Sequence, residues 1–154
     1  MPHQGMVHAL EEIRRLLSPG GVLIDIHPVQ EASRIEVISA GRVFYSEAEP
    51  DTSLEDYRQA EAAFVDVVQR RLFILESTSE FDLLVHSKSV SELATFVQEA
   101  NAYEQRSKSQ AEQVRERELM TRIEKAMREA GAGAEVAIRE RARISRLSVS
   151  FPAA

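Results

Sequence analysis

Cysteine is absent from the 154-residue sequence. This absence excludes disulfides, thiolate metal sites and cysteine nucleophiles. The four histidines, His3, His8, His27 and His86, show none of the close spacings typical of zinc ligands, so we expect no metal site. The Gly-x-Ser-x-Gly motif of a nucleophile elbow is also missing, and we assign no catalytic residue.

Long hydrophobic runs are absent as well. No apolar stretch approaches the roughly 20 residues that a transmembrane helix needs. The first six residues, MPHQGM, lack the basic and apolar segments of a secretory signal. We therefore expect a cytoplasmic protein with no membrane partner. The formal net charge of -6 disfavours nucleic acid as a partner, because phosphate binding depends on clustered Lys and Arg.

One basic cluster lies near the C-terminus. Arg139, Arg141, Arg143 and Arg146 stand in a strand-like stretch that Glu140 interrupts. Arginines at alternate positions are typical of one solvated strand face, and we prefer this interpretation to a phosphate-binding track.

The remaining composition is that of an ordinary globular domain. Hydrophobic residues make up 44% of the chain and charged residues 29%. A chain of this length buries roughly two-thirds of its unfolded surface without needing staples. We expect a single domain over residues 1–154, with residues 1–5 disordered.

Apolar periodicity predicts a mixed α/β chain. Helical spacing covers residues 6–17 and 54–71, and two further helices follow Ser89, separated by a polar break at residues 107–110. Strand-like runs cover residues 22–26, 35–38, 43–45, 73–87 and 134–149. Gly41 favours a tight hairpin turn between the second and third runs, because glycine accepts a positive φ.

The two long strands allow finer predictions. In the strand over 73–87 five apolar residues share one parity, which predicts a single buried face; they are Phe73, Leu75, Phe81, Leu83 and Val85. In the strand over 134–149 the apolar parity changes. This change predicts a bulge near Ser145 and Arg146.

A more specific signal lies in residues 9–24, ALEEIRRLLSPGGVLI, where a helix ends in a Leu-x-Pro-Gly-Gly turn before a strand. This segment resembles the helix before the fifth strand of class I S-adenosylmethionine-dependent methyltransferases. The following hairpin, helix and strand match a bacterial branch of that family in order and spacing, and the last strand resembles its antiparallel seventh strand. The resemblance implies the C-terminal half of a Rossmann-type α/β fold: a mixed sheet with an inserted β-hairpin and three to four helices.

The cofactor motif of that family has no counterpart in the sequence. It consists of a strand, a glycine-rich turn and a helix, followed by an acidic residue that holds the ribose. The six glycines stand at positions 5, 20, 21, 41, 131 and 133, and none follows a suitable strand and opens a helix. The resemblance therefore implies a truncated relative without cofactor-binding residues, which does not bind S-adenosylmethionine alone.

Asp25 and His27 are the candidate ligand-facing residues. They lie at the carboxyl end of the strand that begins at Val22, where ligands bind in open α/β sheets. In the plainer interpretation, which we prefer, Asp25 caps a neighbouring turn and His27 is a surface residue at the strand end.

Val22, Ile24 and Ile26 are the candidate dimer edge. In the resembled fold a fourth strand and the last strand flank this segment, and without the fourth strand the apolar edge is open. An open edge aggregates unless another chain covers it, and the same truncation uncovers the apolar side of the helix over 6–17. We therefore expect a homodimer, the commonest oligomer.

Two functions follow from this reasoning. The first is a non-catalytic methyltransferase-like protein, a dimerising interaction or structural module that can hold a protein partner. The alternative is an acceptor-side subunit or fragment of a methyltransferase whose cofactor-binding half is on another chain, the one case in which S-adenosylmethionine is a cofactor. A small-ligand pocket between the hairpin and the long helices is a third interpretation.

Overall fold

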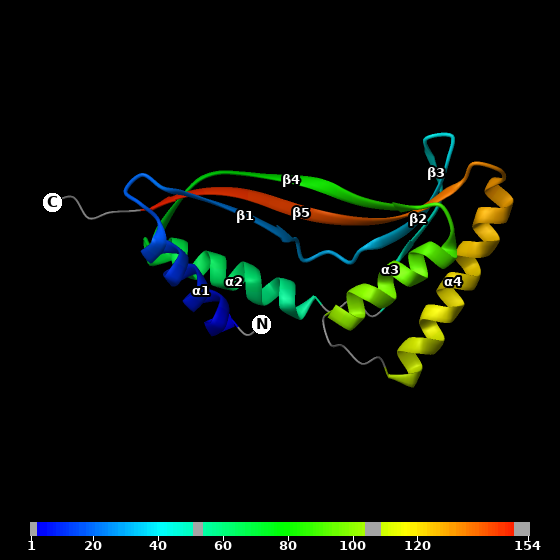
Figure 1. Ribbon diagram of the computed structural model, residues 1–154, viewed down its shortest axis with the longest axis horizontal. Helices are drawn as coiled ribbons and strands as arrows, with labels where there is room; N and C mark the ends of the chain where they lie inside the picture. Colours follow the sequence, from blue (N-terminus) through cyan, green and yellow to red (C-terminus); the bar gives the residue numbers. More distant parts are fainter. Residues whose placement is uncertain (1–2, 51–53, 104–108, 150–154) are drawn as a thin grey trace. The chain divides into compact units, whose positions relative to one another are not determined.

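A computed structural model describes residues 3–50, 54–103 and 109–149 (Figure 1). The elements are α1 (His3–Leu16), β1 (Val22–Pro28), β2 (Arg34–Ser39), β3 (Arg42–Ala48), α2 (Glu55–Gln69), β4 (Phe73–Ser87), α3 (Val90–Tyr103), α4 (Gln110–Ala130) and β5 (Glu135–Val149). Their order confirms the predicted succession of helices, strands and hairpin. Residues 3–5, which we expected to be disordered, form the first turn of α1.

The five strands form one sheet in which β5 lies between other strands. Residues 22–28 of β1 pair with residues 142–148, and β2 pairs with residues 135–139. β3 pairs with β2, and β4 also pairs with β5. The prediction of a mixed sheet is wrong for the described residues, because β5 is antiparallel to its neighbours and separates β1 from β4.

The chain divides into two compact units. The first comprises Met1–Glu31, Ser53–Asp82 and Arg141–Ala154, and the second comprises Ala32–Thr52 and Leu83–Glu140. Both β4 and β5 contribute residues to each unit.

In the first unit, α1 and α2 cover one face of the strands (Figure 1). The two helices pack on each other and share a core with β4 and β5. The buried residues of this core are Val7, Ala63, Phe64, Val67, Phe73, Leu147 and Val149.

In the second unit, α3 and α4 pack against β2 and the start of β5. The buried residues of this core are Ile35, Val37, Val90, Leu93, Leu119, Ile123, Ala126 and Val136. Among the described helices of the chain, none combines the length and the hydrophobicity of a membrane span.

Local sequence explains the turns and helix ends of the second unit. Ala40 and Gly41 both have a positive φ, of 49° and 72°, as the two central residues of a type I′ hairpin turn require. The break between α3 and α4 ends at Ser109, whose hydroxyl accepts a bond from the backbone N–H of Glu112. The Glu112 side chain returns a bond to the N–H of Ser109, completing a capping box.

The buried face predicted for β4 is wrong beyond its first residues. Phe73 is buried as predicted, but Phe81 and Leu83 are 37% and 47% exposed. Polar Thr78 and Glu80 contact side chains of β5 instead. Arginine and hydroxyl partners on β5 therefore bind the polar residues of β4, which stay exposed along this part of the strand.

The bulge predicted near Ser145 and Arg146 is also wrong. The pairing of β5 with β1 runs without a register shift from Ser148 to Ala142. The apolar parity of β5 changes because Ser145, a polar residue, occupies a buried position between Arg143 and Leu147 on the helix-covered face.

Candidate functional site

Asp25 and His27 lie on the face of β1 that α2 covers, next to residues of β5. Leu23, Asp25 and His27 lie opposite Leu147, Ser145 and Arg143 in the β1–β5 pairing. Because Leu23 and Leu147 both belong to the core under α1 and α2, this face of the strand points at the helices.

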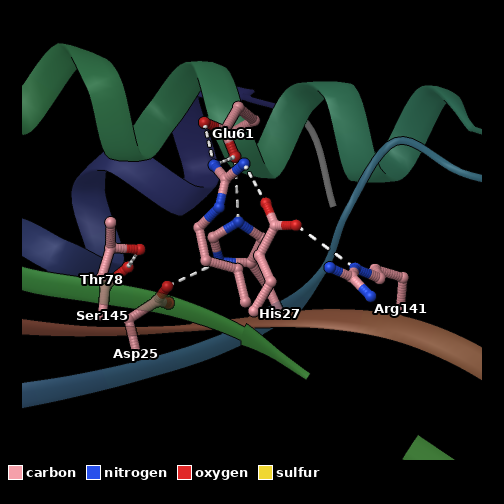
Figure 2. A network of polar contacts seen from close by, with 8 residues as sticks. Asp25, His27, Glu61, Thr78, Arg141 and Ser145 are labelled. Atoms are coloured by element: carbon pink, nitrogen blue, oxygen red, sulfur yellow. Dashed lines mark hydrogen bonds and ion pairs between the residues drawn. The ribbon is translucent and has the colours of Figure 1, made fainter. Parts of the chain in front are cut away.

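His27 is buried between two carboxylates, with 8% of its surface exposed (Figure 2). Its Nδ1 lies 2.6 Å from Oδ2 of Asp25, and its Nε2 lies 3.0 Å from Oε2 of Glu61, on α2. The ring also packs against Phe64 at a centroid distance of 6.0 Å. A neutral imidazole has only one N–H, whereas an imidazolium donates from both nitrogens. The geometry therefore favours the cationic form of His27.

The hydrogen bond to Asp25 is the largest cause that raises the pKa of His27 above its ordinary value of 6.5. Burial opposes this shift, and the hydrogen bond and charge of Glu61 reinforce it. The proton on His27 is thus held by groups from two different elements, β1 and α2.

The network continues from Glu61 along β5 and β4. One terminal nitrogen of Arg143 donates to both oxygens of Glu61, at 2.7 and 2.8 Å. The other donates to Oε1 of Glu80 at 3.1 Å. Arg141 then bridges Oε2 of Glu80, at 3.3 Å, and Asp82, at 3.2 Å. The result is an alternating row of carboxylates and guanidinium groups, and both arginines lower the pKa of Glu80, Arg143 more strongly.

A pair of hydroxyls lies beside this row. Thr78 of β4 and Ser145 of β5 are 3.2 Å apart, and Ser145 is 1% exposed (Figure 2). One hydroxyl proton suffices for their mutual bond, so the pair keeps further donor and acceptor capacity.

A cavity of about 620 Å³ opens between α2 and β4 in the first unit. Its lining residues are Glu61, Phe64, Val65, Val68, Gln69, Leu75, Thr78, Ser79, Glu80, Arg141, Arg143 and Ser145. The volume is in the range of small-molecule sites. It does not lie between the hairpin and the long helices, where the third interpretation placed a pocket.

Asp25 and His27 come together, but they do not line the cavity. They lie behind Glu61 and fix its position. The preferred interpretation of these residues is wrong, since His27 is buried and Asp25 binds His27 instead of capping a turn.

The sequence interpretation also missed the ion pairs of the arginine cluster. Arg141 and Arg143 form ion pairs with Glu80, and Arg146 binds Glu76 at 2.6 Å. Carboxylates stand at alternate positions of β4, as at Glu80 and Asp82, and arginines stand at alternate positions of β5, as at Arg141 and Arg143. That alternation is the signal of cross-strand pairing that could have revealed the row.

The candidate dimer edge has an orientation that the pairing with β5 determines. The N–H of Val29 donates to Arg141, and Gly21 accepts from the N–H of Val149. The backbone groups of Gly21 and Val29 thus point toward β5. In an antiparallel pair, residues that point toward the partner strand alternate with residues that point away from it. The N–H and C=O groups of Val22, Ile24 and Ile26 therefore point away from β5.

This outward side of β1 is not covered by a strand. In the part of the chain that the structure describes, β1 pairs with β5 alone. The side chains of Ile24 and Ile26 lie on the face opposite α2, where the residues are 50% and 59% exposed. β1 thus combines unpaired backbone groups with exposed apolar side chains.

Groups of three or more acidic or histidine side chains able to hold a metal ion are absent from the described residues. Comparisons of the chain with protein-family models, curated proteins and solved structures found no match.

Proposed function

We propose that this chain is a non-catalytic, methyltransferase-like interaction module that forms a homodimer through the outward edges of two β1 strands. The observation that carries the proposal is the edge itself. Val22, Ile24 and Ile26 direct their backbone groups away from β5, and the two isoleucines are about as exposed as they are buried. A long exposed edge of this kind is a template for another strand.

The sequence of β1 is suited to pairing with a second copy of itself. If two strands run antiparallel with Ile24 opposite Ile24 of the other copy, Val22 lies opposite Ile26. The outward N–H and C=O groups of these residues then form about six hydrogen bonds. The exposed side chains form apolar cross-strand pairs, each worth roughly 0.2–1 kcal/mol. Asp25 lies opposite Leu23 in this register, so the two Asp25 carboxylates do not face each other.

The surface of α1 supports an interface on the same unit. Ile13 and Leu16 are 37% and 74% exposed, although both follow the helical spacing that predicts the apolar side of this helix. Residues three positions apart are neighbours on a helix surface, so Ile13 and Leu16 form one small exposed apolar patch on α1.

The methyltransferase-like part of the proposal is supported by the position of β5. The resemblance implied that the last strand is the antiparallel neighbour of the strand that begins at Val22, and β5 holds this position against β1. The hairpin β2–β3 follows β1, and α2 precedes β4, as the resemblance also implied.

The mass in solution tests the homodimer. The chain has a mass of 17.3 kDa, and light scattering after size exclusion should give twice that value at micromolar concentration. Ile24→Pro removes one outward N–H and leaves the bonds to β5 intact, so this variant should be monomeric. Ile24→Lys places two like charges opposite each other and should also be monomeric.

Ile74→Lys is the matched control, because Ile74 is 52% exposed on β4 and lies outside the proposed interface. This variant should remain dimeric. A monomeric wild type, or a dimer that Ile74→Lys disrupts and Ile24→Lys does not, contradicts the proposed interface. A dimer that tolerates Ile24→Pro but not Ile24→Lys indicates face-to-face packing instead of strand pairing.

The alternative is an acceptor-side subunit of a methyltransferase whose cofactor-binding half is on another chain. The cavity between α2 and β4 favours it, because an acceptor needs a pocket. In this alternative the β1 edge pairs with a strand of the other chain, so the wild type alone should be a monomer. Calorimetric binding of S-adenosylmethionine to this chain alone contradicts both proposals.

A further inference from the structure

We propose that proton uptake by His27 strengthens the dimer formed by two β1 strands, so that pH controls the association of the two copies. This role of His27 rests on the proposed homodimer and on its register. Asp25 and His27 belong to the strand that pairs with the second copy, and their side chains lie on its helix-covered face (Figure 2). Pairing of the strands therefore changes the surroundings of this buried network directly.

In the proposed register the Asp25 carboxylate faces an apolar side chain of the second copy. The outward backbone groups belong to Val22, Ile24 and Ile26. Leu23 of one copy and Asp25 of the other therefore form a non-hydrogen-bonded pair, in which side chains approach closely, with Cβ atoms about 4.5–5.5 Å apart. The side chain of Asp25 is 24% exposed in one copy. Leu23 of the other copy removes water from this exposed part and offers no hydrogen bond in return.

The imidazolium of His27 is the cation that compensates Asp25. Its Nδ1 lies 2.6 Å from Oδ2 of Asp25, and in the part of the chain that the structure describes Asp25 forms its ion pair with this ring. Glu61 on α2 binds the other ring nitrogen. Arg143 on β5 lies opposite His27 in the strand pairing, but its guanidinium donates to Glu61 and to Glu80 on β4. The charge of Asp25 thus depends on the proton of His27.

Loss of this proton leaves Asp25 without a counter-charge. An ion pair that loses one partner leaves an uncompensated charge, and the cost of that charge grows as water is excluded from it. The cost is greater in the dimer, where Leu23 of the other copy covers Asp25, than in the monomer, where water reaches the carboxylate. Dimerisation therefore raises the affinity of His27 for its proton. By linkage, the proton raises the affinity of the two copies for each other.

The direction of the pH dependence follows from this linkage. Stabilisation of the dimer by the two His27 protons is complete below the pKa of His27 in the monomer, and it is lost as the pH rises through the pKa in the dimer. The hydrogen bond to Asp25 already raises the pKa of His27 above 6.5 in one copy, so the loss occurs on the alkaline side of this value. Coupling between two binding events typically changes affinity by about 5- to 150-fold. We expect the dissociation constant of the dimer to be about tenfold higher at pH 9 than at pH 6.

Sedimentation equilibrium at pH 6 and pH 9 measures this constant for the wild type and for two variants with opposite expected results. Asp25→Asn removes the carboxylate, and its amide can accept from the His27 ring or donate to it, so the dimer should be equally tight at both pH values. His27→Gln removes the titrating group and leaves Asp25 without a cation, so the dimer should be as weak at pH 6 as the wild type is at pH 9. His86→Gln is the control, because His86 contacts Glu135 outside this network, and it should follow the wild type.

The dimer and its control by pH fail on different results. A wild type that is monomeric at both pH values contradicts the homodimer, and with it this role of His27. A wild-type dimer with the same dissociation constant at pH 6 and pH 9 overturns the control by pH and leaves the interface intact. A rise in the constant that Asp25→Asn shares with the wild type overturns it as well, because other groups then cause the change. If His27→Gln fails to fold, Asp25→Asn and His86→Gln still decide, and far-UV circular dichroism at each pH shows which proteins are folded.

Discussion

Replacement of His27 by glutamine is the most informative perturbation of the buried network. His27 donates to Asp25 and Glu61 at 2.6 and 3.0 Å, and its side chain is 10% exposed. Glutamine has a single amide nitrogen on one short arm, so it can reach one of these carboxylates but not both. The variant also removes a positive charge from between two negative ones.

The expected loss of stability follows from these contacts. A hydrogen bond to a charged group contributes about 1.5–3 kcal/mol. Removing one partner from a buried charge pair costs about 3–5 kcal/mol. Glu61 keeps its bonds to Arg143, and Asp25 and Glu61 are each about a quarter exposed, so the lower part of this range applies. We expect His27→Gln to lower the free energy of unfolding by about 3 kcal/mol.

The same network predicts the sign of a pH dependence. Asp25 on β1 and Glu61 on α2 raise the pKa of His27 in the folded state, and Arg143 on β5 and the Phe64 ring also lie close to this site. A group whose folded pKa is raised contributes its full stabilisation below the unfolded pKa of 6.5. That contribution disappears as the pH rises through the folded pKa. Wild-type stability should therefore fall as the pH rises above 6.5, and measurements at about pH 6 and pH 9 compare the two sides of this value.

Urea unfolding at both pH values measures the two effects, and an NMR titration of the imidazole reports the proton directly. His86→Gln is the control, because His86 contacts Glu135 at 3.2 Å with half of its side chain exposed. The control should keep the wild-type pH dependence, and His27→Gln should lose it. A cost below about 0.5 kcal/mol for His27→Gln, the range of an ordinary surface substitution, contradicts this role of His27. Equal wild-type stability at both pH values contradicts it as well.

Three further predictions concern the second unit, each measured by urea unfolding against the wild type. Arg139→Ala should cost about 3 kcal/mol, because it removes a two-point partner, at 3.0 Å for each bond, from the buried carboxylate of Glu36; a cost near zero means that water satisfies Glu36. Leu93→Ala should cost about 3 kcal/mol, because Leu93 is fully buried and the change leaves a cavity; a cost below about 1 kcal/mol contradicts this packing. Ser109→Ala should cost about 1 kcal/mol by removing the cap of α4, whereas Ser109→Asp, which keeps an acceptor, should cost little.

The local features of the fold could be predicted from the sequence because short-range physics determines them. The φ values of Ala40 and Gly41 follow from the hairpin turn, and the Pro-Gly-Gly segment ends α1 before β1. The buried position of Phe73 follows from period-two alternation. In each case residues a few positions apart determine the outcome.

The candidate site could not be predicted in the same way, because its contacts join distant segments. Glu61 and Arg143 are separated by 82 positions, and Thr78 and Ser145 by 67. The polar side chains of β4 pair with partners on β5, and Phe81 is exposed although apolar parity placed it on a buried face. Pairing the charges of the two long strands is the one sequence argument that anticipates this outcome.

The masses of Ile24→Pro and of the wild type in solution test whether β1 pairs with a second copy of itself. We expect twice 17.3 kDa for the wild type and 17.3 kDa for Ile24→Pro, with the far-UV circular dichroism unchanged between them. Equal masses for the two proteins, whether monomeric or dimeric, contradict an interface built on the outward N–H groups of β1.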